Sequence, residues 1–425
     1  MSQSATSGPT PRGVPTPAPR TQAGAAADIA PDVDPLGIEP FFQPKRAAFW
    51  LLLALLLSGV FSIGQLLGVG LRVVPVAALL GLFAWALYTL GFAAVFRAMD
   101  LLDQHPPAAY VLAFAWGGLG AAHLALPANN AIQSLAAKLV SPEFVVAWGP
   151  ALAGPITEEF LKIVGVILLV LTARSQFRTE LSVLIVGAMA GLGFQVVENL
   201  SYTVRSAITF PSDSQIDPVF WNLVTRGLLR GLWTHAAYTT VASYGLALFL
   251  FRRERTRAAR VGMALLCFAL AWAMHFVWNS PWMEDWFSDG LPGLTLLLLA
   301  KGMPVLFAVA LIWHAATRET GAYLHALAAS VVPERELLRD DEWLCLGSPL
   351  ARWRVRRELG RAYGRRARRL KTRLQREQLR LVLKAGMYGR GARTSRHEMA
   401  IRRLRAKLEA LTPPEGPRRP ATMPP

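Results

Sequence analysis

Five ionisable side chains occur within stretches of the sequence that are otherwise apolar: Glu158, Glu159, Glu198, His235 and His275. An ionisable group at membrane depth costs about 3 kcal/mol on insertion scales, so it is retained where it pairs, lines a wet cavity or does chemistry. Two histidines and a carboxylate are a common zinc-binding set that leaves a position open for water. A further glutamate can act as a general base toward that water. These residue types predict hydrolysis of an amide bond.

Two further polar residues share helix faces with members of this set. Because residues i and i+4 lie on one face of a helix, Lys162 is expected beneath Glu158, where it can offset the charge. Asn279 is expected beside His275, where it can hold the imidazole tautomer or bind a substrate carbonyl. The residues assigned to catalysis are Glu158, Glu159, Lys162 and Asn279, and the candidate metal ligands or catalytic partners are Glu198, His235 and His275.

Two chemical schemes remain open for this set. In the first, a divalent metal, with zinc favoured, is bound and a glutamate serves as the base. In the second, paired glutamates activate water directly, because a like-charged neighbour and a low-dielectric site keep one of them protonated. Either scheme hydrolyses an amide within or beside the membrane.

The composition of the chain predicts an all-α, polytopic transmembrane bundle. Of its 425 residues 53% are hydrophobic and 17% are charged, whereas soluble domains are about a quarter charged. Several apolar runs reach about 20 residues, which spans a bilayer as a helix. The two cysteines, Cys267 and Cys345, allow no disulfide framework and no cysteine-based zinc site. The eight expected helices cover residues 47–69, 73–96, 108–125, 148–172, 181–201, 228–251, 261–282 and 291–315.

Lysines and arginines in the short loops predict the orientation of the bundle. With eight spans, four cationic regions fall on one side, so both termini are expected in the cytoplasm of a multi-pass cell-membrane protein. Three cations between the fifth and sixth helices, Arg205, Arg226 and Arg230, run against this rule. The four cationic regions are Lys45–Arg46, Arg174–Arg178, Arg252–Arg260 and the chain after the eighth helix.

Depth along the expected helices places the ionisable residues in one layer. At 1.5 Å per residue, His235 and His275 lie roughly 10 Å inside the outer boundary, and Glu158 and Glu159 lie roughly 15 Å inside. Glu198 comes near the outer end of its helix. Four helices therefore bring these groups to the outer half of the membrane. His123 lies in the same layer but fits no motif, and Lys301 lies in the middle of the eighth helix.

The chain divides into three regions by composition. Residues 1–44 form a Pro- and Ala-rich leader that is expected to be disordered. Residues 45–316 are expected to form the transmembrane domain that carries the hydrolytic site, and residues 317–425 are expected to form a basic cytosolic helical tail with a disordered end. The net charge of +17 lies largely after residue 350, where leucines follow helical spacing. We expect the tail to bind anionic lipid. Binding of a partner protein is the alternative, and nucleic acid is the less favoured ligand.

Four local patterns resemble the motifs of the PrsW family of intramembrane proteases, which are related to CAAX-processing and bacteriocin-immunity proteases. They are Pro-Ile-Thr-Glu-Glu-Phe-Leu-Lys at 155–162, Gly-Phe-Gln-Val-Val-Glu-Asn at 193–199, His235 with Gly245 downstream, and His-Phe-Val-Trp-Asn at 275–279. Each pattern is weak alone, but four in order over residues 150–280 are specific. The resemblance says nothing about the leader or the tail.

The resemblance implies a helical bundle and proteolysis of membrane-anchored substrates. The founding relative is similar in acting on an anti-sigma factor from the outer side. It also implies that Glu158 and Glu159 are the catalytic carboxylates, with Glu198, His235 and His275 as partners or metal ligands. The expected function is an intramembrane endopeptidase acting near the outer leaflet.

Two other functions use the same residues. A proton or divalent-ion transporter or sensor would also place glutamates and histidines in one layer, although the sequence shows no clear internal repeat of the kind many transporters have. A scaffold without activity would use the basic tail as its effector. The intact motif set argues against an inactive relative.

Overall fold

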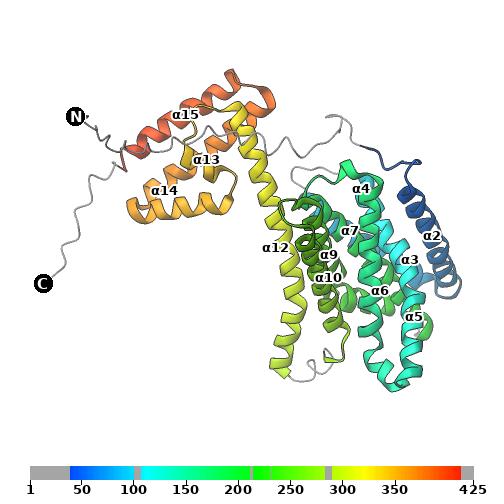
Figure 1. Cartoon of the computed structure of the whole chain (residues 1–425). Helices are drawn as coiled ribbons and strands as arrows, with labels where there is room; N and C mark the ends of the chain where they lie inside the picture. The colour runs from blue at the N-terminus through cyan, green and yellow to red at the C-terminus, as the bar shows by residue number, and fades with distance from the viewer. Residues whose placement is uncertain (1–38, 100–106, 211–213, 230, 283–289, 413–425) are drawn as a thin grey trace, which may run out of the picture. The chain divides into compact units, whose positions relative to one another are not determined.

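The computed structural model of the protein describes residues 39–99, 107–210, 214–229, 231–282 and 290–412. Most of these residues are helical, and none of them lies in a strand (Figure 1). The expected all-α class is therefore confirmed. Among the described residues, six helices are long and apolar enough to cross a membrane. The chain is a multi-pass membrane protein, and the total of eight spans stays a prediction.

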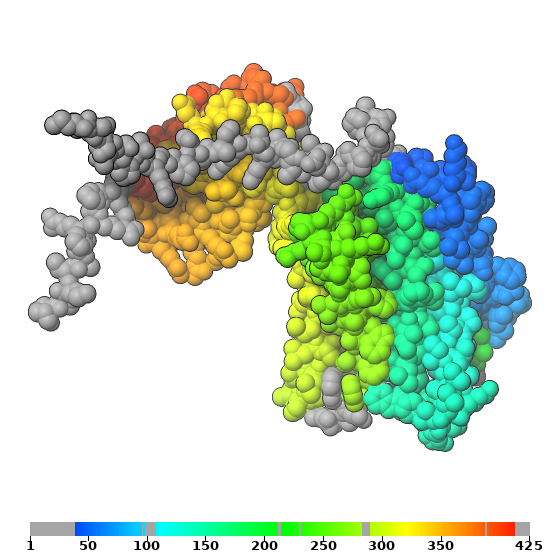
Figure 2. Space-filling view, viewed as in Figure 1, coloured from blue at the N-terminus to red at the C-terminus, as the bar shows by residue number. Residues whose placement is uncertain are grey.

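Each expected transmembrane helix has a counterpart in the structure. On the face seen in the space-filling view, side chains fill the spaces between neighbouring helices (Figure 2). The helices up to the tail are, in chain order, α2 (Ala47–Val73), α3 (Pro75–Met99), α4 (Pro107–Ala115), the π-helix η1 (Trp116–Ala121), α5 (Ala122–Leu139), α6 (Pro142–Thr172), the 3₁₀ turn η2 (Arg174–Gln176), α7 (Glu180–Thr209), α8 (Ile216–Asn222), the π-helix η3 (Leu223–Leu229), α9 (Thr234–Phe251), α10 (Arg257–Asn279) and α12 (Gly290–Val331).

Several helices differ from their expected bounds, and the eighth, expected to end at residue 315, continues as α12 to Val331. The third expected helix, 108–125, continues to Leu139 because η1 joins α4 to α5 in helical geometry. The sixth, expected to start at residue 228, begins at Thr234. Its predecessor Trp233 has φ +60°, in the left-handed region, which a right-handed helix cannot include.

Helix α7 is the centre of the bundle, and nearly all of its membrane stretch is buried. It packs against α3, α4, η1 and α9. Two glycines let α9 approach closely: a Cβ added at Gly191 would lie 2.3 Å from the carbonyl oxygen of His235, and one at Gly187 would lie 2.0 Å from Oγ of Ser243. These glycines therefore allow close helix packing, which places His235 against α7.

Charged side chains join several helices at one end of the bundle. Arg46 donates to the carbonyl of Thr172 at 2.7 Å. Glu180, at the start of α7, pairs with Arg252 at 3.0 Å and with Arg318 of α12 at 3.5 Å. We call this group of residues (Arg46, Glu180, Arg252 and Arg318) the cationic end. The cations that the sequence placed on one side of the membrane thus lie on one side of the bundle, and the assignment of that side to the cytoplasm stays a prediction.

The tail has a hydrophobic core of its own, formed by the last turns of α12 and the helices after it. Leu374 and Leu381 are buried there and Leu370 packs against them, as their helical spacing predicted. Between residues 332 and 412 three helices follow α12. Loop residues at Gly347 and Gly389–Gly391 separate them. They are α13 (Asp340–Leu346), α14 (Pro349–Tyr388) and α15 (Ala392–Glu409).

A buried ionic network ties the tail helices together. Glu342 of α13 accepts hydrogen bonds from Lys371 at 2.9 Å, from Gln378 at 2.7 Å and from Arg405 at 2.7 Å. Burial by itself would raise the pKa of Glu342, but the Lys371 ammonium and the Arg405 guanidinium outweigh it and hold the pKa at about 2. The network therefore links α13, α14 and α15 through one carboxylate.

We expect Glu342→Gln to loosen the tail by about 3–5 kcal/mol, because it leaves two buried cations without a counter-charge. In a Cys267→Ser background, the labelling rate of Cys345 on α13 measures this opening, and it should rise by about 10²-fold or more. Because the folded pKa lies below the unfolded one, the stabilisation is present above pH 4.5 and is lost as the pH falls toward 2. Glu336→Gln, at an exposed residue, is the matched control. Equal labelling in both variants would contradict the prediction.

Candidate active site

The structure brings together all five ionisable residues that the sequence singled out. Glu158 and Glu159 lie in the middle of α6, and Glu198 lies in the second half of α7. His235 is the second residue of α9, and His275 lies four residues before the end of α10. Arg252, at the other end of α9, belongs to the cationic end, so the cluster lies in the half of the bundle away from it.

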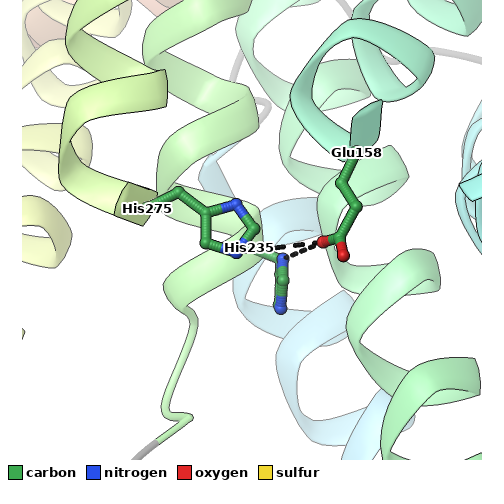
Figure 3. Close-up of side chains that lie close together, drawn as sticks. All are labelled: Glu158, His235 and His275. Carbon is green, nitrogen blue, oxygen red and sulfur yellow. Dashed lines mark ion pairs between the residues drawn. The ribbon is translucent and has the colours of Figure 1, made fainter. Parts of the chain in front are cut away.

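Glu158 points its carboxylate at both histidines (Figure 3). Its Oε1 accepts a hydrogen bond from Asn129 of α5 at 3.0 Å. Its Oε2 is buried and accepts no hydrogen bond from the described residues. This atom lies 3.8 Å from Nε2 of His275 and 4.0 Å from Nδ1 of His235. A carboxylate oxygen with spare acceptor capacity therefore faces two imidazole nitrogens.

Each histidine is held from its other side by a second carboxylate. Nδ1 of His275 lies 2.8 Å from Oε1 of Glu159. Nε2 of His235 lies 3.2 Å from Oε2 of Glu198. A carboxylate on one ring nitrogen fixes the tautomer and leaves the opposite nitrogen as an acceptor, which is how metal-binding histidines are usually oriented. Glu159 and Glu198 thus direct both rings toward Glu158.

The spacing of Lys162 had suggested a pairing with Glu158, but in the structure Lys162 pairs with Glu159 instead. Its ammonium contacts Oε1 of Glu159 at 2.6 Å and donates to Nδ1 of His235 at 3.1 Å. Spacings of three and four residues both bring side chains together on a helix, and Glu158 is turned toward Asn129 instead. Lys162 and Glu159 are completely buried, so the ammonium supplies the charge that a buried carboxylate needs.

Asn279 follows His275 by one turn on the same face of α10, as its spacing predicted. Its side-chain nitrogen lies 3.1 Å from Nε2 of His275 and donates to the carbonyl of Pro150 at 3.2 Å. The amide therefore stands beside the nitrogen that faces Glu158. It can offer a hydrogen bond to an oxygen atom placed there.

A cavity of about 320 Å³ opens beside the cluster, a size at the lower end of the range for ligand pockets. Glu198, His235 and Asn279 form part of its wall, and the Glu198 side chain is 22% exposed. The other lining residues are polar and apolar in mixture: Pro150, Gln195, Asn199, Tyr202, Thr225, Arg226, Gly231, Thr234, Trp278, Ser280, Leu297 and Lys301.

Residues 105–316 match a family model described as PrsW family intramembrane metalloprotease. This part of the chain belongs to the PrsW family. The matched region contains every residue of the cluster and ends within α12, before the tail. No curated protein and no solved structure matches the chain.

The PrsW domain has a donor set that fits the divalent metal implied by the family description. Ligand atoms of Glu158, His235 and His275 all lie within 4.8 Å of one another. The unpartnered Oε2 of Glu158 is the kind of buried atom that a cation would satisfy. Lys162 also donates to Nδ1 of His235, so a metal at that nitrogen would take the place of this contact and leave Lys162 with Glu159. Glu158, which had been assigned to catalysis, is in this candidate group, and Glu198, which had been named as a candidate ligand, is not.

Two residues of the PrsW site were not identified from the sequence. Arg226 donates to Glu198 at 3.1 Å and to Asn199 at 2.9 Å, and its guanidinium lies over the ring of Tyr202. In the sequence, Arg226 stood out only as a cation on the side of the membrane where the distribution of lysines and arginines in the loops predicted none. Asn129, the partner of Glu158, lies beyond the end of the expected third helix, so no membrane-depth signal pointed to it.

The remaining polar residues of this layer have other positions. His123 contacts Oγ of Ser58 at 3.0 Å and stays outside the cluster. Lys301 lies over the ring of Trp278 at 5.0 Å and lines the cavity. At the end of α10, Trp282 contacts Trp148. Arg230, most of the leader and the end of the chain lie outside the described residues.

Proposed function

We propose that the PrsW domain is an intramembrane endopeptidase that hydrolyses peptide bonds of membrane-anchored proteins near the outer leaflet. One observation carries this proposal: two imidazoles, each held by a carboxylate, face a third carboxylate at the wall of a cavity. A histidine pair that served only to join helices would not need three carboxylates. The family description supports the proteolytic reaction.

The residues that would hold the metal are Glu158, His235 and His275. Zinc is the favoured ion, because two histidines and one carboxylate with a remaining open position are a set used by zinc peptidases. When bound, such an ion activates a water molecule and polarises the substrate carbonyl. Glu159 and Lys162 are completely buried, so they orient His275 and balance charge without touching the substrate.

The side chains on the cavity wall would act on the substrate. Glu198 can accept the proton of the attacking water at its carboxylate and return it to the leaving amine. Asn279 can donate its amide hydrogen to the developing oxyanion. Arg226 holds the Glu198 carboxylate in place. This assignment moves the general base from Glu158 or Glu159 to Glu198, because of these carboxylates only Glu198 lines the cavity.

The side of the membrane on which cleavage would occur depends on the orientation of the cationic end. If the cationic end faces the cytoplasm, the cluster lies in the outer half and both termini are cytoplasmic. The substrate would then be a single-span or membrane-proximal protein with its cleavage site near the outer surface. An anti-sigma factor is the example that the family resemblance supplies.

The test compares the membrane proteins of cells that express the wild-type chain with those of cells that express Glu198→Gln. A substrate should accumulate uncleaved with the variant. In proteoliposomes, the purified variant should cleave that substrate about 10²- to 10⁴-fold more slowly. Glu254→Gln, at an exposed glutamate beside Arg252, is the matched control and should keep the wild-type rate.

Two outcomes would count against the proposal. Cleavage by Glu198→Gln at the wild-type rate would contradict the assignment of Glu198 as the general base. If no membrane protein is cleaved and the wild-type chain instead conducts protons or divalent ions in liposomes, the transporter alternative takes its place.

A further inference from the structure

Helix α14 consists of two helices joined at Gly364, which has φ +82°. We call residues 349–363 the first α14 segment. It begins at the N-cap Ser348, whose hydroxyl accepts from the amide of Ala351 at 3.2 Å. Because the left-handed glycine ends its helical path, the segment has its own direction and its own exposed face.

The exposed face of this segment combines apolar and basic side chains. Leu350, Trp353, Arg354, Arg357 and Arg361 follow one another at helical spacing and are all exposed. Leu350 is 54% and Trp353 39% exposed, and the Arg357 guanidinium lies 5.0 Å from the Trp353 ring. A helix with an aromatic and an aliphatic residue among arginines is typical of helices that lie in the headgroup region of a bilayer.

A tight contact fixes where this segment starts. Gly347, two residues before it, packs against Gly321 of α12: a Cβ at Gly347 would lie 2.6 Å from Cα of Gly321. The amide of Gly347 donates to Nε2 of His325 at 3.3 Å, and the His325 ring stacks on Trp343. The start of the segment is therefore attached to α12 near Gly321.

Gly321 lies on α12 within one helical turn of the cationic end. Arg318, three residues earlier, pairs with Glu180 at the cationic end. Three residues of helix span about 4.5 Å, and charges act over about 8 Å at physiological salt. The first arginines of the segment thus start within the reach of lipid headgroups.

We propose that the first α14 segment lies on the bilayer surface and binds acidic phospholipid headgroups. Leu350 and Trp353 enter the interface, and Arg354, Arg357 and Arg361 contact the phosphates. This narrows the lipid contact expected for the whole basic tail to one face of one helix. The apolar residues on this face and the short distance from the cationic end favour lipid over nucleic acid as the ligand. The inference does not depend on proteolytic activity.

The test uses the full-length protein in nanodiscs of phosphatidylcholine, with or without phosphatidylglycerol. In a Cys267→Ser and Cys345→Ser background, an environment-sensitive fluorophore is attached at Glu358→Cys, an exposed position beside the arginine face. We expect a blue-shifted emission and several-fold weaker quenching by iodide in the acidic nanodiscs, both reversed by high salt. The same fluorophore at Ala406→Cys, exposed on α15, should not respond.

Two triple variants with equal loss of charge make the test specific. Replacement of Arg354, Arg357 and Arg361 by Gln should abolish the response. Replacement by Gln of three exposed cations of α15, Arg402, Arg403 and Lys407, should preserve it. An equal response in both kinds of nanodisc, or a response lost only in the α15 variant, would overturn the proposal. A response to short RNA in neutral nanodiscs with none to acidic lipid would also overturn it and would identify nucleic acid as the ligand.

Discussion

Glu158→Gln is expected to lower the rate of substrate cleavage by about 10³-fold or more. A bound metal lowers the activation free energy by several kcal/mol, and it would be held in place only while the Glu158 carboxylate is intact. The substitution keeps the size of the side chain and removes its negative charge. The oxygen concerned, Oε2, is the one that faces His235 and His275 and has no hydrogen-bond partner among the described residues. The measurement is kcat/KM on a tagged membrane substrate in proteoliposomes.

Glu143→Gln provides the matched control for this variant. Glu143 lies on the same helix, in its first turn, and is exposed. It should keep the wild-type rate, which separates loss of the site from loss of a charge on α6. Cleavage by Glu158→Gln at a rate near that of the control would contradict the assignment of Glu158.

The purified protein is expected to bind one divalent ion per chain, with zinc preferred. His275→Ala should weaken this binding by more than about 100-fold, because it removes a ligand. Glu159→Gln should weaken it by about 10- to 100-fold, since Glu159 only orients the His275 ring. Elemental analysis and competition with a fluorescent zinc chelator measure both effects. Chelators should abolish cleavage, and added zinc should restore it.

His123→Ala is the control for metal binding, since His123 bonds Ser58 and stays outside the cluster. It should bind zinc as the wild type does. Protein that contains no metal and cleaves its substrate in the presence of chelators would contradict the prediction. The direct scheme, in which glutamates activate water without metal, would then be correct.

The sequence by itself predicted the helices and the five ionisable residues that meet in the cluster. Apolar runs of bilayer length require helices because backbone groups in lipid must bond internally. The high cost of ionisable groups in such runs singled out Glu158, Glu159, Glu198, His235 and His275. Rise per residue then placed them at one depth, and the structure has them in contact. These inferences depend only on local properties of the chain.

The partners within the site needed the tertiary structure. Helical spacing allows Lys162 to meet Glu158 or Glu159, and the choice depends on Asn129, which comes from another helix and occupies Glu158. The pairing of Glu198 with His235 and the insertion of Arg226 likewise join residues 28 or more positions apart. Side chains compete for partners, so a pairing is decided only when all neighbours are in place.

In the tail, too, some features were predicted from the sequence and others depended on the tertiary structure. Leucine spacing predicted its helices, and Leu374 and Leu381 are indeed in its core. The charge of the tail predicted a contact with acidic lipid but not which helix makes it. The contact between Gly321 and Gly347 decides where the first α14 segment starts, and neither glycine carries a signal of its own. Local preferences act over a few residues and can be read from sequence, whereas contacts between distant elements depend on how the whole chain packs.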